Sequence, residues 1–173
     1  MGFIRGVNMI IIGTDGKEQN IDGCLGCACA SGEFDVFGGN LFETESFILA
    51  QDCELPINGF LVISSKRHIT QITELSEKEQ VDLMKIINKA LKVLKAHDVA
   101  EEYNIVLEEK SSSHFHVWLM PRHKWMLEKF GKVMKNLKPI FDYSLENLRT
   151  KESLDEILKT CEIVKNEMKD FKI

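Results

Sequence analysis

Two histidines lie two residues apart in an apolar, aromatic stretch that reads HFHVWLMPR over residues 114–122. In a β-strand successive side chains point to opposite faces, so His114, His116 and Trp118 would share one face and the apolar residues between them the other. Imidazoles on a buried strand need polar partners. The pattern therefore predicts a strand with one face in the hydrophobic core and the other bound to a metal, a phosphate or a reacting group.

A second group of potential ligands lies upstream, where three of the five cysteines fall within six residues. Cys24 and Cys27 have the spacing with which two thiolates hold one tetrahedral ion, and Cys29 is a competing ligand. His68 follows a predicted strand. With Cys24, Cys27 and one histidine of the pair at 114 and 116, it would complete a closed zinc site of the structural kind and leave the other histidine for chemistry.

Composition sets the class of protein and of partner. The 173 residues, 44% hydrophobic and 28% charged, suit a globular protein with a sizeable core. A net charge of -5 argues against general binding to nucleic acid or to an anionic membrane. We find no run near the roughly 18 apolar residues of a membrane span. An odd number of clustered cysteines favours metal binding in a reducing cytoplasm over a disulfide framework.

The elements that must position these residues follow from periodicity. Alternating or continuous apolar runs predict strands over 9–12, 34–37, 46–50, 60–63, 103–107 and 114–120. A helix should begin at Ser76, with Glu79 completing a capping box, and end near residue 97. Further helices are predicted over 126–137 and 144–148, and a last one should be capped by Ser153 and Glu156. The apolar stripe of this last helix must pack on the sheet or on a second subunit.

Taken together, the motifs resemble the histidine-triad (HIT) superfamily, whose hallmark is His-any-His-apolar-His followed by two apolar residues, often then Pro-Arg. The family also has apolar-Ala-any-Asp, Pro, Gly, an apolar strand and Lys-Arg-His in this order. The chain has these at 49–52, 56, 59, 60–63 and 66–68. The resemblance covers roughly residues 24–125 and implies an α+β, HIT-like fold, a mainly antiparallel sheet with a packed amphipathic helix. Residues 1–125 would form the nucleotide-binding domain, and 126–173 a C-terminal helical extension packed on it.

By this resemblance, Cys24, Cys27, His68 and His114 are the ligands of a structural zinc ion, as in the zinc-bearing members. His116 matches the family nucleophile, which attacks the α-phosphorus of a nucleotide and carries the nucleotidyl group as a phosphoramidate. Imidazole suits this role because its neutral nitrogen is nucleophilic near pH 7.

Other matched positions would contact the nucleotide. Asp52 matches the acidic residue that pairs with ribose hydroxyls, although an aspartate here could also cap a turn. Ser111 and Lys110 fall where the phosphate is held, although the segment also reads as a polar turn. Asn104 would orient the site from the neighbouring strand or be a surface residue. Trp118 replaces the third histidine of the motif and, unlike histidine, cannot shuttle a proton.

The sequence thus predicts a nucleotidyl hydrolase or transferase acting on a dinucleoside polyphosphate, a nucleoside phosphoramidate or a similar nucleotide. We expect a cytoplasmic homodimer that binds neither nucleic acid nor membrane. One alternative is a nucleotide-binding or regulatory protein in which Trp118 marks a weakened site. Another is a purely structural zinc protein with Cys24, Cys27, His114 and His116 all on the metal.

Overall fold

The computed structural model describes residues 8–107, 109 and 113–173. Its centre is a five-stranded antiparallel sheet with the strand order β3-β4-β5-β7-β6. The strands are β3 (Asn40–Glu43), β4 (Phe47–Gln51), β5 (Leu61–Ser65), β6 (Tyr103–Leu107) and β7 (His116–Pro121). The stretch that begins at His114 therefore lies next to the middle of the sheet, with β5 on one side and β6 on the other.

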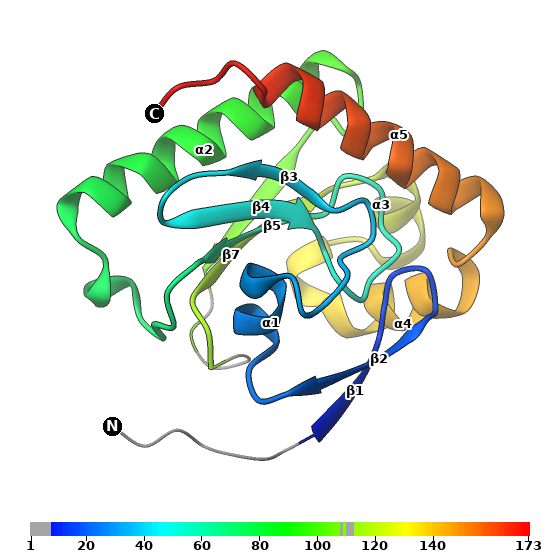
Figure 1. Cartoon of the computed structure of the whole chain (residues 1–173). Coiled ribbons are helices and arrows are strands. Elements are labelled where there is room, and N and C mark those ends of the chain that lie inside the picture. The colour runs from blue at the N-terminus through cyan, green and yellow to red at the C-terminus, as the bar shows by residue number, and fades with distance from the viewer. Residues whose placement is uncertain (1–7, 108, 110–112) are drawn as a thin grey trace.

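Helices α2 (Glu77–Ala96) and α5 (Lys151–Met168) lie side by side over one face of the sheet (Figure 1). This face carries the odd-numbered residues of β7 and its approach, and they are almost fully buried against the two helices. The main hydrophobic core therefore includes Phe115, Val117 and Leu119. The prediction that one face of β7 lies in the hydrophobic core is confirmed. The apolar stripe on α5 packs on the sheet.

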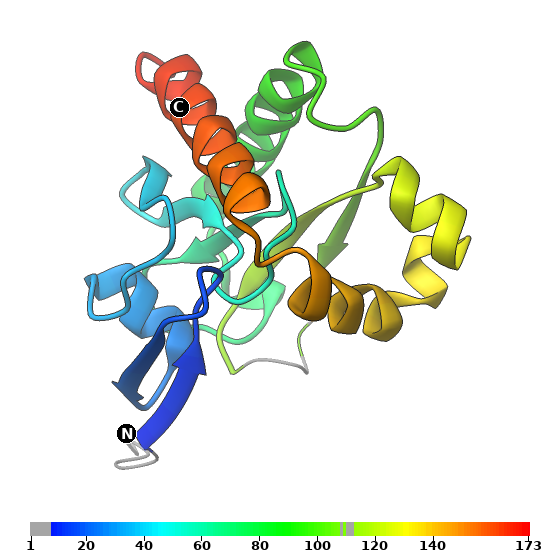
Figure 2. The same cartoon turned by 90° about the vertical axis from the view of Figure 1, so that its right-hand side faces the viewer.

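The opposite face of the sheet is only partly covered. Helix α1 (Leu25–Ser31) and the hairpin of β1 (Asn8–Ile12) and β2 (Glu18–Asp22) cover one part of this face. Helices α3 (Lys124–Phe130) and α4 (Leu137–Asn147) lie on the other (Figure 2). Each group has its own small hydrophobic cluster. The even-numbered side chains of β4, β5 and β7 are thus left between two covering groups.

Helix α2 begins as its sequence predicts. Ser76 is the N-cap, its hydroxyl accepts a hydrogen bond from the amide of Glu79, and the Glu79 carboxylate accepts one from the Ser76 amide. The Glu79 carboxylate also accepts two hydrogen bonds from Arg67, at 2.9 and 2.8 Å. Because His68 follows directly, this ion pair fixes the loop that carries a predicted metal ligand.

Four predicted elements differ from the structure. One is the helix predicted over 144–148, which is only the last part of α4 (Leu137–Asn147). Residues 34–37 form no strand, because the side-chain amide of Gln19 makes both hydrogen bonds to the backbone of Asp35, at 2.7 and 2.9 Å, that a neighbouring strand would make. The helix predicted over 126–137 ends at Phe130, where Gly131 adopts a positive φ of 73°. Helix α5 begins at Lys151, since Thr150 rather than Ser153 is the N-cap.

Two further helical turns, η1 (Ile72–Glu74) and η2 (Val133–Lys135), join the elements around these helices. Within the ranges that the structure describes, no helix is both long enough and apolar enough to cross a bilayer.

Candidate metal and nucleotide site

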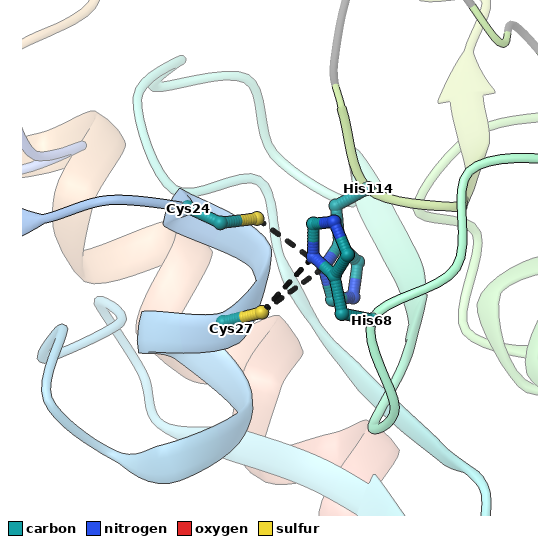
Figure 3. Close-up of side chains that lie close together, drawn as sticks. All are labelled: Cys24, Cys27, His68 and His114. Atoms are coloured by element: carbon teal, nitrogen blue, oxygen red, sulfur yellow. Dashed lines mark hydrogen bonds between the residues drawn. The ribbon is translucent and has the colours of Figure 1, made fainter. Parts of the chain in front are cut away.

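Four side chains that are far apart in the sequence meet between α1 and the sheet (Figure 3). The ligand atoms of Cys24, Cys27, His68 and His114 all lie within 4.8 Å of one another. The imidazole Nδ1 of His114 is 3.3 and 3.6 Å from the two sulfurs, and that of His68 is 3.3 Å from Cys27 Sγ. A tetrahedral zinc ion with bonds of about 2.0–2.3 Å sets its ligands about 3.3–3.8 Å apart. The cluster fits such an ion.

The tautomer of His114 suits a metal ligand. Its Nε2–H donates to the backbone carbonyl of Ser65 at 2.7 Å, so Nδ1 presents its lone pair to the two thiols. Ligating histidines are usually oriented by a hydrogen bond of this kind. Burial lowers the pKa of His114, which keeps the ring neutral. Burial, with Cys24 beside it, raises the pKa of Cys27 to about 11, and a cation would offset this cost of forming the thiolate.

Gly26 allows the two halves of this cluster to meet. A Cβ atom at this position would lie 2.3 Å from Cγ of His114 and 2.5 Å from its Cδ2. The imidazole packs directly on the helix backbone between the two cysteines, so only glycine fits there. This residue was not among the predicted site residues, although a glycine between two ligand cysteines was visible in the sequence.

His116 lies beside the cluster without being part of it. Its Nδ1–H donates to the backbone carbonyl of His114 at 2.9 Å, which leaves the lone pair on Nε2. The ring is half-buried at a cavity on the partly covered face of the sheet. An imidazole with one nitrogen fixed as a donor and the other free is suited to nucleophilic attack.

The cavity has a volume of about 460 Å³, and its floor is the even-numbered face of three strands. Cross-strand register places Ile48, Ser64 and His116 in one row, and Ala50, Val62 and Trp118 in the next. One wall comes from α1 and the β1–β2 hairpin, through residues that include Met9, Ile11, Leu25 and Cys29. No sequence pattern linked the hairpin to the site, because its approach to the sheet is a long-range contact.

Asp52 caps a turn at the edge of the cavity, and its contact with a ribose stays a prediction. Its Oδ1 caps the turn after β4 by accepting hydrogen bonds from the amides of Glu54 and Leu55, at 3.0 and 2.8 Å. The residue also lines the cavity, and its Oδ2 makes no hydrogen bond to the described part of the chain. Burial raises the pKa of Asp52 to about 6.

Trp118 lies next to His116 on the cavity floor, with ring centroids 5.6 Å apart. The edge-on rings of Phe60 and Phe141 hold the indole, at 5.8 and 6.1 Å. Phe141 belongs to α4, so the C-terminal helices support a residue of the cavity.

One predicted nucleotide contact does not line the cavity, and two others are not among the described residues. Asn104 is on β6, where it pairs with Met120 of β7, and it does not line the cavity. Its predicted role in orienting the site therefore stays a prediction. Ser111 and Lys110 lie outside the described residues.

Comparison with known proteins identifies the domain that carries β3 to β7. Residues 40–125 match the family model described as the HIT domain. A search of curated proteins gave no match.

Many solved structures have the same fold. A zinc-bound histidine-triad family protein from Mycobacterium smegmatis is 15% identical, with a TM-score of 0.57 over 83% of this chain and 96% of that one. A hypothetical histidine triad nucleotide-binding protein from Sulfolobus tokodaii is 20% identical, with a TM-score of 0.57 over 87% and 99% of the two chains. The Plasmodium falciparum diadenosine triphosphate hydrolase, crystallised with Cyclomarin A, is 9% identical, with a TM-score of 0.52 over 76% and 77%. The matching domain and the shared fold identify the chain as a member of the histidine-triad family.

Proposed function

We propose that the protein is a nucleotidyl hydrolase or transferase that forms a covalent nucleotidyl intermediate on His116. The observation that carries this proposal is the 2.9 Å hydrogen bond from His116 Nδ1–H to the His114 carbonyl, which leaves a basic Nε2 at a cavity large enough for a nucleoside phosphate. Membership of the histidine-triad family and a structural neighbour named as a hydrolase support it.

In the proposed reaction, His116 Nε2 attacks the α-phosphorus, the P–Nε2 bond forms, and the bond to the leaving group breaks. Water or another acceptor then attacks the same phosphorus and releases the nucleotidyl group. With water, the products are a nucleoside monophosphate, the free imidazole and one proton. The Oδ2 atom of Asp52 would accept hydrogen bonds from the ribose hydroxyls.

We propose zinc as the metal of the Cys24, Cys27, His68 and His114 cluster. Among the described residues the cluster consists of two thiols and two imidazoles, and two thiolates with two neutral imidazoles form the closed set typical of structural zinc. Bound there, zinc would fix the position of His114, whose carbonyl orients the nucleophile.

The proposed covalent mechanism is tested by trapping the nucleotidyl intermediate. Zinc-loaded protein is mixed with nucleotides labelled at the α-phosphate, quenched in base, and digested to locate the label. We expect label on His116 in the wild type, none in His116→Ala, and wild-type labelling in His97→Ala, a half-exposed histidine that does not line the cavity. Failure of all donors to give adduct or turnover would refute the proposal.

The same variants separate the alternatives. The cluster contains His68 and not His116, so His116→Ala should retain its zinc. Zinc loss in this variant would favour the structural zinc protein. If nucleotide raises the melting temperature of the wild type while no adduct or product forms, the chain is a binding or regulatory protein.

We also propose that the chain forms a homodimer through its sheet. Strand β6 is at an edge of the sheet, and Ile105 and Leu107 on it are 53% and 39% exposed. Light scattering should give a dimer for the wild type and a monomer for Ile105→Lys. We further propose a location in the reducing cytoplasm, where the thiols clustered at Cys24, Cys27 and Cys29 would stay available to a metal.

A further inference from the structure

A second cavity, of about 550 Å³, shares no lining residue with the one beside His116. It is lined by the end of α2, the start of α3, one face of α5 and the loop that joins β4 to β5. Helix α5 is outside the matched domain of residues 40–125. The volume is typical of a site for a small molecule, and the proposed reaction does not use it.

A hydroxyl group without a partner faces this cavity. Thr160, on α5, lines the cavity and is only 4% exposed. Its Oγ1 makes no hydrogen bond to the described part of the chain, yet the atom is not sealed from solvent. Because the rest of the residue is buried, this oxygen is reached from the cavity. The lining around it is apolar and includes Ile57, Val99 and Ile163.

His123, at the N-cap of α3, presents a second unpartnered atom. Its Nε2–H donates to the backbone carbonyl of Asn58 at 2.8 Å, so Nδ1 carries a lone pair. The side chain makes no capping hydrogen bond to α3, and Nδ1 is not sealed from solvent. Burial lowers the pKa of His123, so the ring is neutral at pH 7 and Nδ1 is a hydrogen-bond acceptor.

A carboxylate lies close to both of these groups. The charge of Glu156 opposes the fall in the pKa of His123, which places this carboxylate near the ring. Glu156 is also one helical turn before Thr160 on α5, so their side chains are neighbours on the helix surface. Three acceptors, an imidazole nitrogen, a hydroxyl and a carboxylate, therefore gather in one part of the cavity.

The charges around the cavity favour a cation. Its exposed charged residues are two acids, Asp98 and Glu156, and one base, Lys159, and among the described residues none of them makes an ion pair or a side-chain hydrogen bond. The acids and the imidazoles of this cavity are not gathered as metal ligands, since the described residues contain a metal-binding group only at the Cys24 cluster. An extended organic molecule therefore suits the cavity better than a metal ion.

We propose that this second cavity binds a small organic cation, a protonated amine carried on an apolar body. An ammonium group has three donors and no acceptor, which matches the three acceptors contributed by His123, Glu156 and Thr160. The body would pack on the apolar lining and beside Trp125, whose ring stacks on His123 with centroids 6.5 Å apart. A carboxylate ligand would instead meet two acids and a lone pair.

The two tryptophans of the chain allow the cavities to be observed separately, since Trp118 lines the first and Trp125 the second. Zinc-loaded full-length protein is titrated with phenethylamine at pH 7, and the two indole N–H signals are followed by heteronuclear NMR, with Trp118→Phe and Trp125→Phe to assign them. We expect a saturable shift of the Trp125 signal with a Kd of about 1 mM or lower. The Trp118 signal should not move.

Two analogues share the body of the amine and differ in charge. Phenethyl alcohol, which is neutral, should bind at least about tenfold more weakly than phenethylamine, because a hydrogen bond from a charged donor is the stronger one. Phenylpropionate, which is an anion, should bind more weakly than the alcohol.

Variants assign the binding to the three acceptors. Glu156→Gln removes the charge, and Thr160→Val removes the hydroxyl at nearly constant volume, so each should weaken amine binding about threefold or more. Asp155→Asn, at an exposed acid of α5 that does not line the cavity, should bind as the wild type does. Melting temperature and zinc content show that each variant is folded.

The proposal fails if the Trp125 signal shows no saturable shift up to about 10 mM amine, or if the Trp118 signal shifts in its place. Equal affinity for the amine and for phenylpropionate, or wild-type affinity in both Glu156→Gln and Thr160→Val, would also overturn it. Because the two cavities share no residue, none of these results bears on the covalent mechanism at His116.

Discussion

Replacing Asp52 with asparagine should stabilise the fold and weaken nucleotide binding. Burial raises the folded-state pKa of this carboxyl from 3.8 to about 6. The folded protein therefore holds the proton more tightly than the unfolded chain, and stability falls as the pH rises from about 4 to about 6 and stays lower above it. This difference in pKa corresponds to about 3 kcal/mol above pH 7 and to roughly half of that at pH 5.

Asparagine keeps an Oδ1 acceptor for the amides of Glu54 and Leu55 but carries no charge. Asp52→Asn should therefore exceed the wild type in free energy of unfolding by up to about 3 kcal/mol at pH 8 and by roughly half of that at pH 5. Urea denaturation of zinc-loaded protein at both pH values measures this, and comparison within each pH removes the contribution of metal release.

A matched control is Asp22→Asn, at an exposed position of β2, which should change stability little at either pH. Asp52→Asn also lacks the charged acceptor for the ribose, so it should bind a nucleoside monophosphate about tenfold or more weakly than the wild type. Calorimetry measures this difference. An Asp52→Asn protein that is less stable than the wild type at pH 8, or whose advantage does not grow between pH 5 and pH 8, would refute this reasoning.

Two other predictions concern the metal cluster and the loop beside it. Gly26→Ala places a methyl group against the His114 ring and should abolish stoichiometric zinc, measured with a chromophoric chelator. Gly32→Ala, which meets no atom within 4 Å and costs only the strain of a φ of 79°, should keep it, so full zinc in Gly26→Ala would contradict the structure. Arg67 lowers the pKa of Glu79 to about 2, so the stability that this pair adds is present above about pH 4.5 and is lost as the pH falls toward 2. Acidification from pH 6 to pH 3 should cost the wild type about 1–2 kcal/mol more than Glu79→Gln in urea denaturation, and parallel pH profiles would argue against this.

Local patterns predicted the elements that carry the site. The alternation after His114 identified the two faces of β7, and the capping box identified the start of α2, because both signals depend on residues close in sequence. The ordered motifs also predicted which two cysteines and two histidines would meet.

Long-range contacts were beyond such patterns. The strand predicted over 34–37 failed because a distant side chain, Gln19, takes the place of a strand partner. For the same reason the sequence did not reveal that Met9 and Ile11 line the cavity, or that Phe141 supports Trp118. Each depends on how separate elements pack, which neither periodicity nor spacing encodes.

Arg149 makes the chain a less modular protein than its matched domain suggests. From the end of α4, its guanidinium donates to the carbonyls of Gly13 and Glu54, both at 3.2 Å. It thereby joins the first hairpin, the turn that holds Asp52 and the C-terminal helices, and the first and last of these lie outside residues 40–125. A segment cut to these residues would keep His116 but lose Cys24 and Cys27, the hairpin that lines the cavity and Phe141, which packs against Trp118. A fragment that is meant to keep the site must therefore include the β1–β2 hairpin, the matched domain and the C-terminal helices together.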